Sequence, residues 1–146
     1  ANTAPILDAG CGGGIQAEPL AMLGYGPFTG IDLSEGMLEV ARAKNLYREL
    51  RQMTLGEKLD FPDDKFAAII STGTITPHHA PPKSFEELIR IARPGAPIIF
   101  SMRDNPAQEE RFWGLDQMGM LAQWLAKPDE LTHIATANLS ELPTGL

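Results

Sequence analysis

The sequence predicts one α/β domain, a doubly wound and mostly parallel sheet with helices on both faces. Three observations lead to this fold class. Short apolar runs alternate with segments of helical spacing along the 146 residues. The first run ends at Asp8 and breaks into four glycines within five residues, a density that suits a tight loop after a strand. A second run, 28–32, also ends in an acid, so both acids would lie at the carboxyl edge of the sheet.

Composition and charge narrow the classes of function. The hydrophobic fraction of 43% and the charged fraction of 21% are ordinary for a globular protein of this length. The net charge of −7 argues against a nucleic-acid partner, because phosphate backbones attract clustered lysine and arginine. No apolar run approaches the ~20 residues of a membrane span. Cys11 is the one cysteine, which excludes an internal disulfide and fits a reducing cytoplasm.

Two strand–helix units are expected in the first part of the chain. They comprise a strand over 5–8, a helix over 15–23, a strand over 28–32 and a helix over 35–44. In the first helix Ile15, Leu20 and Leu23 are available for the core, and Pro19 bends or shortens the helix because it removes a hydrogen bond. Ser34 is a good N-cap for the second helix.

The stretch 46–55 is ambiguous, since 46–50 suit a helical turn whereas 51–55 could be a short edge strand. The later elements expected are a buried central strand over 66–71, a helix over 84–92, a strand over 97–101, a helix over 105–125 and a strand over 131–137. No seventh strand is clear, which could leave an exposed sheet edge and invite a homodimer. The chain lacks an initiating Met, and we expect a segment to precede the first strand.

One constellation carries most of the chemical information. It is Asp8-x-Gly10-x-Gly12-x-Gly14, followed by Asp32 twenty residues past Gly12. A glycine loop that opens a helix lets a ligand approach backbone amides, and an acid at the end of the second strand suits a ribose diol. The other interpretation is a tight turn with an incidental surface aspartate.

Four segments in this order resemble motifs of the Rossmann-like (class I) S-adenosylmethionine-dependent methyltransferases. They are the glycine loop at 6–14, the ribose-binding segment at 30–38, the fourth-strand segment at 59–70 and the Arg-Pro-Gly turn within 88–96. The resemblance covers about 6–103 and implies one methyltransferase domain over 1–146. Within the family, 54–56 and 73–82 look closest to the methyltransferase-like proteins associated with the Williams–Beuren chromosomal region.

The resemblance implies a set of residues around S-adenosylmethionine and its product S-adenosylhomocysteine. The backbone of Gly10, Gly12 and Gly14 would face the methionine moiety, and Asp8 would orient that loop or the amino group. Cys11 would stand at the small position of the same cofactor-binding loop. Asp32 would take the ribose hydroxyls, and Leu33 and Met37 would pack on the adenine. Leu55, with Gly56 beside it, stands where many relatives have an acid for the adenine amino group. Thr72 and Gly73 would lie near the sulfonium methyl.

The resemblance favours direct transfer of a methyl group to a small-molecule acceptor. Positioning of the acceptor in line with the methyl group supplies much of the rate acceleration of such a reaction. His79 is the candidate general base; the other interpretation is that it only packs among the neighbouring prolines. No His or Cys cluster has the spacing of metal ligands, so no metal is expected. Two other functions stay open: a cofactor-binding module or partner subunit that does not catalyse, and a nicotinamide-dependent oxidoreductase. Gly-x-Gly-x-Gly spacing disfavours the oxidoreductase.

Overall fold

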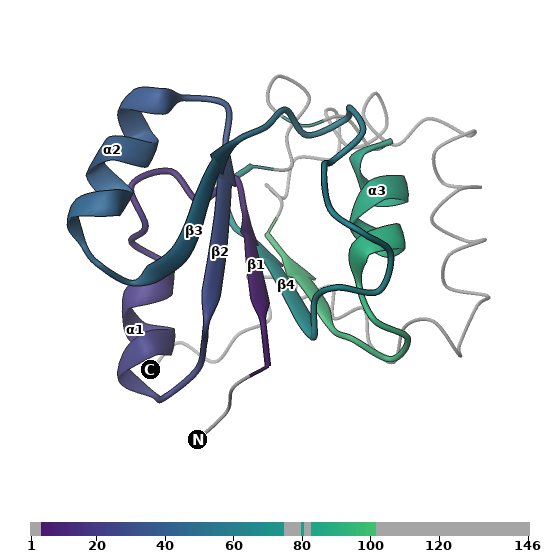
Figure 1. Cartoon of the computed structure of the whole chain (residues 1–146), viewed down its shortest axis with the longest axis horizontal. Helices are drawn as coiled ribbons and strands as arrows, with labels where there is room; N and C mark the ends of the chain where they lie inside the picture. Colours follow the sequence, from purple (N-terminus) through teal and green to yellow (C-terminus); the bar gives the residue numbers. More distant parts are fainter. Residues whose placement is uncertain (1–3, 75–79, 81–82, 102–146) are drawn as a thin grey trace, which may run out of the picture.

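The computed structural model describes residues 4–74, 80 and 83–101. These residues form a five-stranded parallel sheet in the order β3-β2-β1-β4-β5. The strands are β1 (Ile6–Ala9), β2 (Phe28–Asp32), β3 (Tyr47–Gln52), β4 (Ala68–Ser71) and β5 (Ile98–Phe100). The helices are α1 (Ala17–Met22), α2 (Glu35–Ala43) and α3 (Ser84–Ile91). Helices α1 and α2 lie on one face of the sheet and α3 lies on the other, which confirms the expected fold class (Figure 1).

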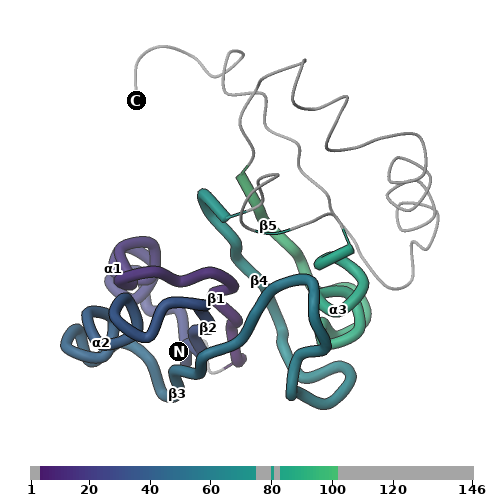
Figure 2. Tube along the Cα trace, turned by 90° about the horizontal axis from the view of Figure 1, so that it is seen from above, coloured from purple at the N-terminus to yellow at the C-terminus, as the bar shows by residue number. Residues whose placement is uncertain are grey.

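Strand β1 occupies the centre of the sheet. It pairs with β2 on one side and β4 on the other, so Asp8 stands opposite both Gly30 and Ile70. From β1 the chain winds outward through β2 to β3, and it then returns to the other side of β1 to build β4 and β5 (Figure 2). Ligands of open α/β sheets bind where the strand order reverses in this way, beyond the carboxyl ends of the strands.

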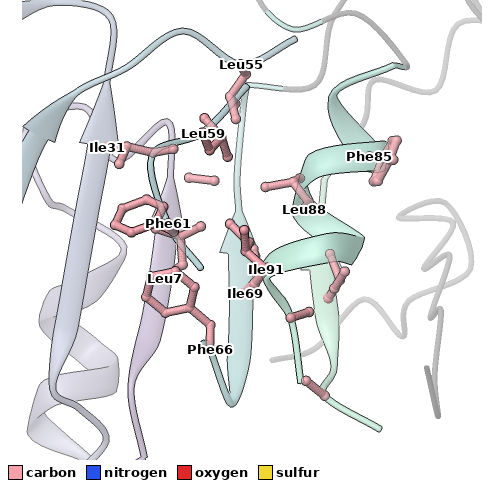
Figure 3. Packing of buried hydrophobic residues seen from close by; sticks show 14 of the residues in the cluster. Leu7, Ile31, Leu55, Leu59, Phe61, Phe66, Ile69, Phe85, Leu88 and Ile91 are labelled. Carbon is pink, nitrogen blue, oxygen red and sulfur yellow. The ribbon is translucent and has the colours of Figure 1, made fainter. Parts of the chain in front are cut away.

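Alternation of side chains along the strands divides the core into two clusters. The larger lies between the sheet and α3, and Figure 3 shows Leu7 and Ile69 in it beside Leu88 and Ile91 of the helix. The smaller lies on the opposite face, where Ile6, Ala17 and Phe28 are buried together. Both faces of the central strands are therefore covered, as expected for a parallel sheet.

Helices α2 and α3 follow their sequence signals. The Ser34 hydroxyl accepts a hydrogen bond from the Met37 amide at 3.3 Å, which confirms the expected N-cap of α2. In α3 the apolar positions Phe85 and Leu88 are fully buried against the sheet. The chain leaves α3 at Ala92 and turns through Pro94 toward β5, as the sequence predicts.

Two expectations about the elements are wrong. Residues 46–50 form no helical turn, because β3 begins at Tyr47 and pairs in parallel with β2. Of the three residues expected in the core from the helix over 15–23, Ile15 and Leu23 are 69% and 74% exposed and lie outside the core, whereas Leu20 packs against the smaller cluster. The helix begins only at Ala17, which places Pro19 in the first turn, where a missing N–H is tolerated.

The expected elements over 105–125 and 131–137 lie outside the described residues. Within the described part of the chain, no helix is long and apolar enough to span a membrane.

Candidate functional site

Asp32 joins the glycine loop to the end of β2. Its Oδ2 accepts a hydrogen bond from the Gly12 amide at 2.9 Å, and its Oδ1 accepts one from the Ser34 amide at 2.8 Å. A carboxylate offers about four acceptor positions, so each oxygen keeps capacity for a further donor. Two oxygens held in fixed positions at the end of a strand could accept hydrogen bonds from a pair of neighbouring hydroxyls, and the ribose-binding role of Asp32 stays a prediction.

The amides of the glycine loop are mostly satisfied within the protein. Those of Gly10 and Cys11 donate to the Ile31 carbonyl at 2.8 and 2.9 Å, and that of Gly14 donates to Cys11 at 3.0 Å. Together with Gly12, four loop amides are thus occupied, and among the described residues only the Gly13 amide of the loop has no acceptor. The bare amides expected from the sequence reduce to this one group. A ligand would otherwise meet the loop through its Cα atoms and carbonyl oxygens.

Two loop glycines are required by the packing of the protein itself. Gly10 and Gly14 have φ values of 74° and 87°, which disfavour any side chain. A Cβ on Gly10 would lie 2.3 Å from the hydroxyl oxygen of Thr74, and a Cβ on Gly14 would lie 3.0 Å from the Tyr47 ring. The sequence left two interpretations of these glycines open, a ligand-binding loop and a tight turn, and this packing requires glycine at both positions under either one.

Asp8 lies beneath the loop at the end of β1 and is only 1% exposed. Its Oδ2 accepts a hydrogen bond from the Tyr47 hydroxyl at 2.6 Å, and its Oδ1 is buried without a partner among the described residues. Burial raises the pKa of Asp8 to about 6; the hydrogen bond from Tyr47 opposes this rise, and the charge of Asp32 adds to it. The expected role toward the cofactor stays a prediction, because the side chain faces into the protein.

Tyr47 is the main site residue that sequence reasoning missed. It belongs to β3, lies 39 residues from Asp8 in the chain, and reaches over β2 at Gly30 to make its hydrogen bond. No local pattern signals such a contact. Only the correct placement of β3 beside β2 would have brought the two side chains together.

Cys11 is a packing residue and has no features of a nucleophile. Its thiol is buried and contacts the Gly12 carbonyl at 3.6 Å. Burial, reinforced by the charges of Asp8 and Asp32, raises the pKa of Cys11 to about 12. The thiol is therefore protonated at neutral pH.

The residues predicted to contact the adenine fall into two groups. Leu33 and Met37 follow Asp32 and are 64% and 42% exposed, so two apolar side chains are presented to solvent beside the carboxylate. They could cover a flat ring. The side chain of Leu55 instead belongs to the larger core cluster and is 8% exposed. Leu55 and its neighbour Gly56 could therefore offer mainly backbone groups.

The end of β4 is tied to the two neighbouring strands. The Ser71 hydroxyl donates to the Ala9 carbonyl at 2.8 Å, and the Gly73 amide donates to the Ser101 hydroxyl at 2.8 Å. The Thr74 hydroxyl donates to the Gly10 carbonyl at 3.2 Å. Thr72 and Gly73 therefore lie at the same sheet edge as Asp8 and Asp32, where the sequence predicts them.

His79, the candidate base, lies outside the described residues. Among the residues that the structure does describe, no group of three or more His, Cys, Asp or Glu side chains could hold a metal ion.

A family model and two curated relatives give matches to methyltransferases. Residues 6–95 match the family described as "Methyltransferase domain". The human protein Methyltransferase-like protein 27 is 34% identical over 87% of this chain and 55% of its own length. The Ubiquinone biosynthesis O-methyltransferase of Alkalilimnicola ehrlichii is 37% identical over 69% of this chain and 42% of its own.

A solved structure gives the same result. The S-adenosylmethionine-dependent methyltransferase from Mesorhizobium loti superposes with a TM-score of 0.59 at 27% identity. The match covers 68% of this chain and 46% of that one. The chain thus spans about half the length of the proteins it resembles, 55% and 42% for the two curated relatives.

Proposed function

The chain belongs to the Rossmann-like, S-adenosylmethionine-dependent methyltransferases, and from this premise we propose that it transfers a methyl group from S-adenosylmethionine to a small-molecule acceptor. The observation that carries the proposal is the fixed carboxylate of Asp32, held by the Gly12 and Ser34 amides at the reversal of strand order. The similarity to Methyltransferase-like protein 27 agrees with the methyltransferase-like branch expected from the sequence.

The residues at the sheet edge would divide the work of binding. Asp32 would accept hydrogen bonds from the two ribose hydroxyls with its unused acceptor capacity. Exposed Leu33 and Met37 would cover the faces of the adenine. The glycine loop would face the methionine moiety through its free Gly13 amide and its Cα atoms.

The chemistry asks chiefly for alignment. When bound, S-adenosylmethionine supplies a methyl carbon on a sulfonium sulfur, which is open to direct displacement. Thr72 and Gly73, at the carboxyl end of β4, would border the space in which the acceptor is aligned. His79 is our candidate to take the proton of an acceptor that needs a base.

Calorimetric titration of the 146-residue chain with S-adenosylhomocysteine tests the proposal. We expect saturable binding by the wild type, and we expect Asp32→Asn to weaken this binding at least tenfold. The asparagine side chain has one acceptor oxygen in place of two, so it loses the hydrogen bond from either the Gly12 or the Ser34 amide, and it lacks the charge that strengthens both bonds. Asp64→Asn is the matched control. Asp64 lies in an exposed turn that precedes β4, at the opposite edge of the sheet.

The outcome separates the candidate functions. No binding by the folded wild type contradicts the proposal, and binding of a nicotinamide dinucleotide instead would favour an oxidoreductase. Binding without methyl transfer to a panel of small acceptors would favour a non-catalytic module. Phenols open that panel, because one relative is named an O-methyltransferase of ubiquinone biosynthesis. A single domain over 1–146, a cytoplasmic location and a homodimer stay predictions.

A further inference from the structure

Tyr47 is wedged beneath the glycine loop. Its ring occupies space left by two glycines, because a Cβ on Gly30 would lie 2.9 Å from one ring edge and a Cβ on Gly14 would lie 3.0 Å from the other. Its hydroxyl then meets Oδ2 of Asp8 at 2.6 Å. One side chain of β3 thereby connects β2, the loop and the carboxylate at the end of β1.

The Asp8 carboxylate depends on this hydrogen bond. Among the described residues, Tyr47 is its one donor, and Oδ1 is buried without a partner. A buried carboxylate stays an anion only where donors replace the lost hydration. Burial already raises the pKa of Asp8 to about 6 against the opposing effect of Tyr47. Loss of the hydroxyl would shift Asp8 toward its neutral form.

None of the ionisable groups described around Asp8 and Tyr47 replaces the hydrogen bond from Tyr47 as a stabiliser of the Asp8 anion. Asp32, at the end of β2, carries a like charge that also raises the pKa of Asp8. Cys11, in the loop, is a neutral thiol. Glu18 of α1 and Lys44 after α2 form an ion pair with each other at 2.6 Å. Their charges offset one another beside the tyrosine.

We infer that Tyr47 is a positioning residue for cofactor binding, which keeps Asp8 an anion beneath the glycine loop. This inference rests on the proposed function, because it concerns affinity for S-adenosylmethionine. The methyl donor carries a positive sulfonium that S-adenosylhomocysteine lacks, so an anionic Asp8 favours donor over product. Tyr47 acts through Asp8 and needs no contact with the cofactor.

Tyr47→Phe removes the hydroxyl and keeps the ring, and Tyr25→Phe at an exposed tyrosine is its matched control. The test is calorimetric titration with S-adenosylmethionine and S-adenosylhomocysteine from pH 5 to 9. Ionisation of the ligands cancels in the ratio of variant to wild-type dissociation constants.

The wild type should bind S-adenosylmethionine more tightly as the pH rises through the pKa of Asp8, about 6. Tyr47→Phe should move this midpoint upward by about one to two pH units and weaken binding at pH 7 by about two- to tenfold, with recovery toward pH 9. The preference for donor over product should fall in parallel. Tyr25→Phe should follow the wild type throughout.

An equal loss of affinity at every pH would show that the hydroxyl acts by a route other than the ionisation of Asp8, and no loss at any pH would show that only the ring matters. Either result would overturn the inference, while the proposed function would stand. Asp8→Asn adds a second check, because it should abolish the midpoint, and Tyr47→Phe in that background should not restore it. A wild type that binds neither compound contradicts the proposed function instead. In that case the Asp8 carboxyl can be titrated by ¹³C NMR in the ligand-free protein. A higher titration midpoint in Tyr47→Phe than in the wild type supports the inference, and equal midpoints overturn it.

Discussion

Gly30 shows how closely one position is fitted to its neighbours. It lies in the middle of β2 with no side chain, and three side chains converge on the space that this leaves. A Cβ there would lie 2.6 Å from Leu50, 2.9 Å from the Cys11 sulfur and 2.9 Å from the Tyr47 ring. The glycine therefore admits the tyrosine that reaches Asp8.

Gly30→Ala should lower the free energy of unfolding by about 1–3 kcal/mol, because three packed side chains must move to admit one methyl group. The free energy of unfolding from urea denaturation measures this. Gly36→Ala is the matched control, since a Cβ there would meet only the Ser34 hydroxyl at 3.8 Å in an exposed helix. That change should stabilise by about 0.5 kcal/mol. A Gly30→Ala protein as stable as the wild type would contradict the packing argument.

At the scale of elements, α3 holds the segment that leads into β4. Arg90 donates hydrogen bonds to the carbonyls of Leu59 and Phe61, each at 2.9 Å, and to both oxygens of Glu87. Glu87 in turn accepts the Leu59 amide at 2.7 Å. The helix thus supplies polar partners to a stretch of irregular backbone that would otherwise lack them.

This network predicts a pH dependence of stability. The hydrogen bond from Arg90 is the main cause that lowers the pKa of Glu87 below its usual 4.5, so the carboxylate stabilises the fold above that pH and loses its effect as the pH falls through the lowered value. Glu87→Gln should therefore cost about 1 kcal/mol at pH 7 and less at pH 3, measured by urea unfolding at both. The exposed neighbour variant, Glu86→Gln, should show no such difference. A constant cost of Glu87→Gln at both values would exclude the ionic contribution.

Elements with a local signal could be predicted from the sequence, and those fixed by distant partners could not. The cap at Ser34 and the helix over 84–92 depend on signals within single segments, and both were predicted correctly. The side chains of β3 are all exposed or only partly buried, and its apolar positions resemble a helical turn. Pairing with β2 makes this segment a strand, and its local sequence pattern does not predict that pairing.

At the scale of the whole molecule, the candidate site is built from the ends of separate strands. The acids at 8 and 32 could be placed at one edge from sequence, because carboxyl ends of parallel strands share an edge. The hydrogen bonds that give the site its shape could not, because Tyr47 and Thr74 contact the glycine loop only after the sheet has formed.

Binding at such an edge should stabilise the whole sheet. S-adenosylhomocysteine at about one hundred times its dissociation constant should stabilise the wild type by about 2.7 kcal/mol, since it binds the folded chain alone. For a chain of this size we expect a rise in melting temperature of about 5 to 10 °C, measured by differential scanning calorimetry. At the same concentration, Asp32→Asn with its at least tenfold weaker binding should gain at most about 1.4 kcal/mol, about half of the wild-type stabilisation. An equal rise in both proteins would place the ligand elsewhere.

The contacts among Asp8, Gly30 and Tyr47, which lie on three neighbouring strands, also constrain how the sequence can diverge. A side chain at position 30 and a tyrosine at position 47 compete for one volume. A descendant that gains the first should lose the second, and the acid at position 8 then loses its hydroxyl donor. Positions 8, 30 and 47 should therefore be inherited as a set, although the chain separates them widely.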